Sequence, residues 1–322
     1  MITEKIAFVF PGQGAQRVGM ARDLYDEYQV VRHTFEQVSD ISHKNVAQAC
    51  FSGPKEILNK PEMTSLGTFA HSVSIAKIIE THFGDTPLYN IGYAVTGHSM
   101  GQYSALHCVG SLTMKDAVVL LSARSTYMSM AGQDGGGMAC IIGLDKGTIE
   151  KVLLAASGHG FAAISNHNAR DQFIISGQND ALDVVVARAR AMGAKMARRL
   201  NVSVPAHCAL MQNAEYLLRA RLENIDVKSP KTNWFSNQTA NVMSNPQDVK
   251  DALADQMTHG VRWLEIMEKF PEYNITCAYE LGPGKVLSGL INRANVGCQA
   301  HVTDNLKNVR AMLAELENKI SR

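Results

Sequence analysis

The sequence lacks an excess of charge of either sign. Its 322 residues include 31 lysines and arginines against 30 aspartates and glutamates, which gives a net charge of +1. Proteins whose main partner is nucleic acid usually carry a basic surplus or a basic stripe. We therefore do not expect nucleic acid to be a partner.

Long apolar runs and paired cysteines are also missing. Residues 1–5 lead into only five apolar residues, 6–10, before Pro11. This run is too short for the core of a signal peptide or for a membrane span. The six cysteines are scattered and form no Cys-x-x-Cys pair, which favours reduced packing thiols over a disulfide framework or a zinc site. We expect a cytoplasmic protein without membrane contact.

The sequence does contain enough apolar residues for a full core, since 46% are hydrophobic and 19% are charged. Strand-like and helix-like segments alternate along the chain, which is typical of an α/β fold with a parallel sheet. Before residue 132 we expect strands at 6–10 and 91–96, and helices at 65–83, 102–109 and 113–131.

A glycine-rich segment at 132–137 predicts a loop and a domain boundary. Beyond it we expect strand 138–142, helix 145–157, strands 161–165 and 172–176, helix 179–192 and strand 195–202. This β-α-β-β-α-β order is the ferredoxin-like pattern. The α/β pattern resumes from Pro205, with a helix at 209–224, a strand at 276–281 and a closing helix from Asn305. We predict a large α/β-hydrolase-like domain of residues 1–131 and 203–322, with an inserted ferredoxin-like domain of residues 132–202.

The pentapeptide Gly97-His98-Ser99-Met100-Gly101 matches Gly-x-Ser-x-Gly and lies between an expected strand and an expected helix. In that context the motif predicts a nucleophile elbow, a sharp turn that projects the serine hydroxyl away from the sheet. Ser99 is then the candidate covalent nucleophile. A chance glycine-rich turn is the alternative.

A serine nucleophile needs a base, because a free hydroxyl is too weakly acidic to attack at neutral pH. Among eleven histidines, His207 follows the inserted domain in Val204-Pro205-Ala206-His207, where the chain re-enters the large domain. A solvated or core histidine is the alternative. An α/β-hydrolase places its histidine near the chain end, so the long stretch after His207 makes a plain esterase a poor fit.

Four motifs occur in order: residues 10–14 (FPGQG), 97–101 (GHSMG), 202–207 (VSVPAH) and 281–286 (LGPGKV). Together they resemble the malonyl-CoA:acyl carrier protein transacylase family over essentially the whole chain. The resemblance implies that Ser99 is the nucleophile and His207 its base. It also implies that the Gln256 carbonyl orients His207, and that backbone N–H groups of Gln13 and Met100 form the oxyanion hole.

The position of Arg124 in its expected helix also indicates burial. It lies three residues after Leu121 and seven after Ala117, so it shares their apolar helix face. A buried guanidinium needs an anion, and a carboxylate accepts two parallel hydrogen bonds from it. An internal salt bridge or a side chain that reaches solvent are the alternatives. The resemblance implies that Arg124 binds the malonyl carboxylate.

Other positions either match the family or depart from it. Asn166 matches a position near the pocket, although a capping or turn role is equally open. Three residues depart from the pattern: Gln102 replaces a usual glutamate, Ser125 a usual glycine, and Ala206 a usual serine. None of these departures removes a catalytic group.

The resemblance implies that a malonyl group passes from malonyl-CoA to Ser99 and then to the phosphopantetheine thiol of acyl carrier protein. No bound cofactor or metal is expected, and we expect a monomer. Arg188, Arg190, Lys195, Arg198 and Arg199 form a basic cluster that either meets an acidic carrier or is a solvated face. Two other functions are alternatives: an editing acyl hydrolase and a catalytically silent docking module. The pathway (fatty-acid or polyketide) and a methylmalonyl preference stay open.

Overall fold

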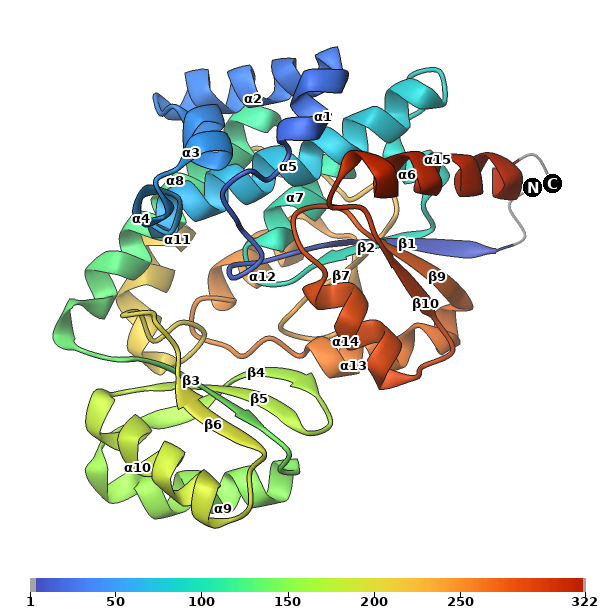
Figure 1. The fold of residues 1–322 in the computed structure, drawn as a ribbon. Helices are drawn as coiled ribbons and strands as arrows, with labels where there is room; N and C mark the ends of the chain where they lie inside the picture. Colours follow the sequence, from blue (N-terminus) through green and yellow to red (C-terminus); the bar gives the residue numbers. More distant parts are fainter. Residues whose placement is uncertain (1–3, 321–322) are drawn as a thin grey trace.

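The structure is a computed structural model that describes residues 4–320. Its strands form two separate sheets, one of six strands and one of four (Figure 1). The mixed α/β class, with a parallel sheet and a smaller antiparallel one, is confirmed.

The six-stranded sheet has the order β10-β9-β1-β2-β7-β8, and its neighbouring strands are parallel except for the β7–β8 pair. Its strands are β1 (Lys5–Phe10), β2 (Ala94–Gly97), β7 (Asn233–Phe235), β8 (Val242–Met243), β9 (Ile275–Glu280) and β10 (Gln299–Val302). Phe10 pairs with Gly97, and Val9 with Glu280. The carboxyl ends of β1, β2 and β9 therefore meet at one edge, where α/β folds concentrate their ligand sites.

Helices cover both faces of this sheet, as the continuous burial of residues 6–10 of β1 requires (Figure 1). Phe8 and Phe10 point into the larger core, and Ala7 and Val9 point into the smaller one. The larger core is built with α1 (Arg22–Glu27), α2 (Gln29–Ser42), α3 (Val46–Ser52), α4 (Lys55–Leu58), α5 (Pro61–His82), α6 (Leu88–Ile91), α7 (Gly101–Cys108), α8 (Met114–Ala131), α11 (Gln212–Glu223), α12 (Pro246–Asp255) and α15 (Leu306–Ile320). The smaller core is built with α13 (Trp263–Lys269) and α14 (Val286–Ala294).

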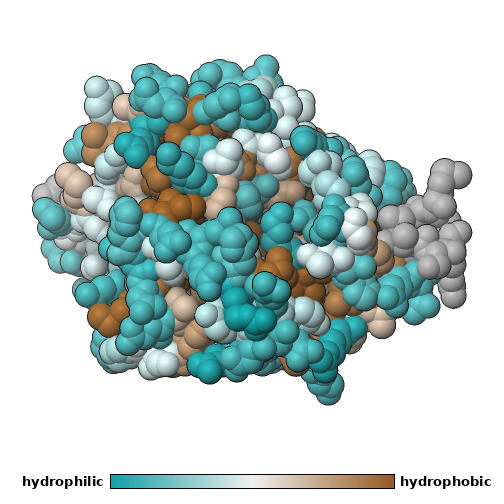
Figure 2. Space-filling model, turned by 90° about the horizontal axis from the view of Figure 1, so that it is seen from above, coloured by the Kyte–Doolittle hydropathy of each residue, from teal (hydrophilic) through white to brown (hydrophobic). Residues whose placement is uncertain are grey.

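The outer helices are amphipathic. Helix α2 buries Val31, Thr34, Phe35 and Val38 and turns its polar side to solvent. Figure 2 shows this face of the molecule, on which hydrophilic residues dominate and hydrophobic ones form separate small patches. Among residues 4–320, no helix combines the length and the apolar character that a membrane crossing requires.

The four-stranded sheet has the order β4-β5-β3-β6 and is antiparallel. It comprises β3 (Gly137–Ile142), β4 (Ala162–Ala169), β5 (Gln172–Gly177) and β6 (Met196–Arg199), with α9 (Lys146–Ala156) and α10 (Asn179–Ala191) against it. These elements bury a core of their own, and in Figure 1 they lie below the large sheet. The order along the chain is β-α-β-β-α-β, as expected. We propose residues 132–202 as the inserted domain on this basis; its exact limits stay a prediction.

Two local expectations were wrong. The strand expected at 91–96 begins only at Ala94, because Pro87 starts the short helix α6, which runs to Ile91. The glycine-rich segment is not wholly irregular: it contains a 3-10 turn at Gly132–Asp134, and Gly137 already belongs to β3. The other 3-10 turns are Ser157–His159, Ala209–Met211 and Pro271–Tyr273.

Candidate active site

Ser99 lies on a sharp turn between β2 and α7, at the carboxyl edge of the parallel sheet. Its φ angle is 53°, in the left-handed region that side chains other than glycine rarely adopt. The turn requires both flanking glycines. A Cβ on Gly97 would lie 2.0 Å from the backbone of Gly101, and a Cβ on Gly101 would lie 2.2 Å from the Phe10 carbonyl oxygen. The local geometry is therefore that of a nucleophile elbow.

Asn237, two residues after β7, holds the elbow in place, and no sequence motif indicated this role. Its Oδ1 accepts a hydrogen bond from the Ser99 N–H at 2.7 Å, and its Nδ2 donates to the Gly97 carbonyl at 2.7 Å. Gln102 supports the same turn, since its Nε2 donates to the carbonyls of Gly97 at 2.7 Å and Phe235 at 3.1 Å. The two side chains satisfy buried backbone groups that the strained turn leaves unpaired.

Replacing Asn237 with alanine should destabilise the protein. The buried Ser99 N–H would lose its acceptor, and an unsatisfied buried polar group costs about 1–3 kcal/mol. Urea denaturation measures the change in unfolding free energy. Asn224→Ala is the matched control, because Asn224 is exposed and should shift stability by less than about 0.5 kcal/mol. Equal stability of the Asn237→Ala variant and the wild type would show that Asn237 does not support the elbow.

His207 contacts Ser99 through one ring nitrogen and Gln256 through the other. Its Nε2 lies 2.8 Å from Ser99 Oγ, and its Nδ1 lies 2.6 Å from the Gln256 carbonyl oxygen. A carbonyl oxygen only accepts, so Nδ1 must carry the proton in this arrangement. Nε2 is then left with its lone pair facing the Ser99 hydroxyl, which is the arrangement a general base needs.

The environment of His207 keeps its ring neutral. Burial lowers the pKa of His207 from its ordinary value of 6.5 to about 3, and the charge of Arg124 acts in the same direction. The hydrogen bond to the Gln256 carbonyl opposes these effects and raises the pKa. At neutral pH the ring is therefore unprotonated and able to accept a proton from Ser99.

Arg124 comes from α8 and reaches Ser99 from another side. It is only 5% exposed, and its Nη2 donates a hydrogen bond to Ser99 Oγ at 3.0 Å. Its buried Nε has no partner, and none of the ion pairs within residues 4–320 involves it. Desolvation lowers the pKa of Arg124. Both alternatives raised for Arg124, an internal salt bridge and a side chain that reaches solvent, disagree with this geometry.

The two expected oxyanion donors lie on loops that meet beside Ser99. Met100 immediately precedes α7, and Gln13 follows β1. The residue before Gln13, Gly12, packs so closely on the elbow that a Cβ there would lie 2.5 Å from the His98 carbonyl oxygen. The role of the Gln13 and Met100 N–H groups as donors stays a prediction.

The smaller sheet also contacts the elbow, through Asn168. Its Oδ1 lies 2.9 Å from His98 Nε2, and burial lowers the pKa of His98. Asn166, two residues earlier on β4, accepts a hydrogen bond from its neighbour Ser165 at 3.1 Å. The place of Asn166 in a substrate pocket stays a prediction, whereas the Asn168 contact was not foreseen from the sequence.

One cluster within residues 4–320 has donor atoms spaced for a metal ion: Cys277, His301 and Glu315, whose ligand atoms lie within 4.8 Å of one another. It lies on β9, β10 and α15. The ammonium of Lys319 already contacts this cluster, at 3.1 Å from Cys277 Sγ and 2.8 Å from Glu315 Oε1. The cluster thus holds its own cation, and we assign it no metal.

Comparison with known proteins places this geometry in a family. Residues 7–283 match the acyl transferase domain family. The chain is 36% identical over 310 residues to a malonyl CoA-acyl carrier protein transacylase of Haemophilus influenzae, covering 96% of this chain and 98% of that one.

Solved structures of other proteins support the same family. The malonyl CoA-acyl carrier protein transacylase of Coxiella burnetii superposes with a TM-score of 0.93 at 32% identity, covering 98% of each chain. A type II PKS acyl-carrier protein in complex with its malonyl-transacylase provides another match. It has a TM-score of 0.92 at 33% identity and covers 97% of this chain and 100% of that one.

Proposed function

Because the chain belongs to the malonyl-CoA:acyl carrier protein transacylase family, we propose that it transfers a malonyl group from malonyl-CoA to the phosphopantetheine thiol of an acyl carrier protein. The observation that carries the proposal is the convergence of two side chains, His207 and Arg124, on the Ser99 hydroxyl oxygen. Ser99 Oγ lies 2.8 Å from the base His207 and 3.0 Å from the guanidinium of Arg124, which forms no ion pair in the described part of the chain. A nucleophile beside a buried guanidinium suits an acyl group that ends in a carboxylate.

In the first half-reaction, Ser99 Oγ attacks the thioester carbonyl carbon of malonyl-CoA while His207 Nε2 takes the hydroxyl proton. The negative charge that develops on the carbonyl oxygen is stabilised by the N–H groups of Gln13 and Met100. Collapse of this intermediate breaks the carbon–sulfur bond. The CoA thiolate leaves and takes the proton from His207, and malonyl-Ser99 remains.

The second half-reaction reverses these steps with a different thiol. His207 Nε2 takes the proton of the phosphopantetheine thiol, whose sulfur attacks the ester of malonyl-Ser99. The malonyl group then leaves on the carrier, and Ser99 Oγ regains its proton from His207. The exposed Arg188, Arg190, Lys195 and Arg198 on the smaller sheet and its helix are available to meet an acidic carrier. Arg199 is less available, since it pairs with Asp183 at 2.8 Å.

Two alternative functions are less consistent with the site. An editing hydrolase acts on varied acyl chains and gains nothing from a buried guanidinium beside its nucleophile. A silent docking module does not need a serine in strained backbone geometry with a correctly oriented base. We further propose that the reaction takes place in the cytoplasm, which fits the six buried free thiols of residues 4–320.

The test is a transfer assay followed by intact-mass spectrometry. The protein is mixed with malonyl-CoA, and holo acyl carrier protein is then added. We expect a malonyl adduct on the protein that moves to the carrier. Loss of the adduct to water without carrier loading would indicate a hydrolase, and the lack of any adduct would indicate a docking module. Competition between fatty-acid and polyketide carriers in the same assay assigns the pathway.

A further inference from the structure

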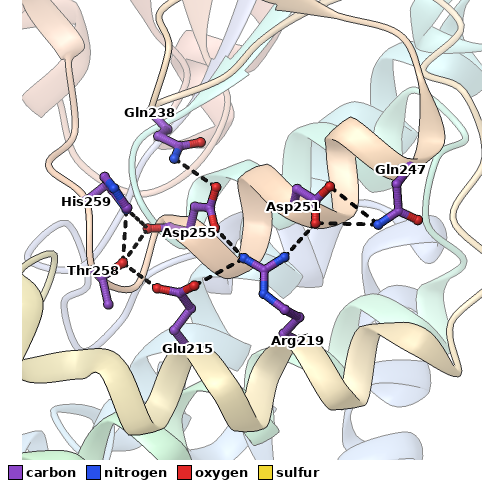
Figure 3. A network of polar contacts seen from close by, with 8 residues as sticks. All are labelled: Glu215, Arg219, Gln238, Gln247, Asp251, Asp255, Thr258 and His259. Atoms are coloured by element: carbon purple, nitrogen blue, oxygen red, sulfur yellow. Dashed lines mark hydrogen bonds and ion pairs between the residues drawn. The ribbon is translucent and has the colours of Figure 1, made fainter.

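A polar network joins helices α11 and α12 and takes no part in the chemistry described above (Figure 3). At its centre, the guanidinium of Arg219 on α11 contacts three carboxylates. It lies 3.1 Å from Glu215 on the same helix and 2.5 Å from Asp251 on α12, and it also pairs with Asp255 at the end of α12. One arginine thereby fixes helix α11 against helix α12.

The network ends on both sides of the residue that orients the histidine. Asp255 immediately precedes Gln256, whose carbonyl accepts the His207 Nδ1–H at 2.6 Å. Thr258, two residues after Gln256, donates to Glu215, which also contacts Arg219. The backbone that carries the Gln256 carbonyl is therefore tied to α11 before and after that residue (Figure 3).

A second branch reaches the elbow. The other carboxylate oxygen of Asp255 accepts a hydrogen bond from Gln238 Nε2 at 2.9 Å. Gln238 follows Asn237, whose side chain holds the N–H of Ser99. The Gln256 side chain also lies between the two branches, since its Nε2 donates to the Ser99 carbonyl at 3.2 Å. Asn237, which holds the Ser99 N–H, is therefore adjacent in sequence to Gln238, the partner of Asp255. Gln256, which orients His207, is adjacent to Asp255 itself.

From this arrangement we propose that Arg219 is a positioning residue for catalysis: through Asp255 and Glu215 it sets the Gln256 carbonyl on His207 and thereby the orientation of the base toward Ser99. This proposal rests on the proposed acyl transfer, and it adds a residue outside the substrate pocket that controls the orientation of the base. Arg219 contacts neither Ser99 nor His207, so its effect passes through the backbone.

The charges explain why the arginine is needed. Glu215, Asp251 and Asp255 converge on one cation, so without it they would repel one another and push the end of α12 away from α11. Isolated exposed ion pairs contribute little to stability, but Arg219 holds three partners in fixed geometry. Burial lowers the pKa of Arg219, and its bonds and charge interactions with the three carboxylates outweigh that effect and raise it. The guanidinium is therefore permanently charged.

The test compares Arg219→Met with the wild type in the pre-steady-state formation of the malonyl-enzyme. A displacement of about 1 Å at a catalytic group can cost on the order of 100-fold in rate, and we expect the kcat for acylation to fall about 10-fold with an unchanged KM for malonyl-CoA. Arg219→Lys should recover part of the rate, because an ammonium keeps the charge but not the two-pronged geometry.

The pH profile of the acylation rate distinguishes a positioning role of Arg219 from a general loss of active enzyme. The groups that face His207 are Ser99, Arg124 and His98, and the Gln256 carbonyl is the contact that raises the His207 pKa. When that carbonyl moves away, the pKa falls further, so the acid limb of the acylation rate should shift to lower pH. The downfield proton resonance of the His207 Nδ1–H should also weaken or broaden. A merely structural loss would lower the active fraction without moving either signal.

Arg22→Met is the matched control, because Arg22 forms an exposed pair with Asp26 at 2.9 Å on α1, and it should behave as wild type. If Arg219→Met does not fold, Asp255→Asn tests the same link and should lower kcat in the same way. Wild-type kcat and an unmoved acid limb in folded variants would overturn the proposal. Failure of the proposed function is distinguishable, since the wild type itself would then form no malonyl adduct.

Discussion

Arg124→Ala should lose malonyl transfer while it keeps, or even gains, activity toward acetyl-CoA. The guanidinium is buried and forms no ion pair within residues 4–320, so the variant would lose the cation that is placed to bind the malonyl carboxylate. A neutral acyl group would no longer meet an uncompensated charge. The change should also raise the pKa of His207, because the charge of Arg124 lowers it, and so make the base stronger.

The expected size follows from the loss of one partner of a buried charge pair, which costs about 2–5 kcal/mol. That corresponds to about 30-fold to several thousandfold in the ratio of kcat/KM for malonyl-CoA over acetyl-CoA. The ratio is measured for both proteins. A change of less than about threefold, equivalent to under about 1 kcal/mol, would show that Arg124 is a structural arginine.

His207→Ala should slow formation of the malonyl-enzyme by about 100-fold to 10,000-fold, the usual contribution of a general base. The alanine removes the acceptor that lies 2.8 Å from Ser99 Oγ and leaves Arg124 in place to bind substrate. Single-turnover kinetics with malonyl-CoA measure the rate. His159→Ala serves as the control, since His159 is exposed and should be neutral. Near-normal rates in the His207 variant would mean that another group accepts the Ser99 proton.

Part of the fold could be predicted because its signals are local. The alternation of apolar segments marks every strand and both helices of the smaller sheet, and strands β1, β2 and β9 of the larger one, with ends that differ from the observed ones by a few residues. The short strands β7, β8 and β10, and the helices between residues 22 and 58, were not expected. The elbow could be predicted for the same reason, since two glycines, a serine, a strand and a helix all lie within one short stretch. The steric demand for Gly97 and Gly101 shows why that spacing is fixed.

The supporting residues could not be predicted, because their contacts join segments far apart in the chain. Asn237 meets Ser99 across 138 positions, and Arg219 meets Asp255 across 36. Nothing in the periodicity of α11 or α12 indicates that their charged side chains face one another. Arg124 lies between these cases: its apolar neighbours indicated burial, whereas the lack of a carboxylate partner within residues 4–320 became visible only in three dimensions.

Mass spectrometry of the acylated protein determines whether Ser99 Oγ carries the malonyl group. Wild-type protein and Ser99→Ala are incubated with malonyl-CoA, and their intact masses and proteolytic peptides are compared. We expect one malonyl group on the wild type, located on the peptide that contains Ser99, and none on the variant. A malonyl adduct that persists in folded Ser99→Ala, or that maps to another peptide of the wild type, would contradict this expectation.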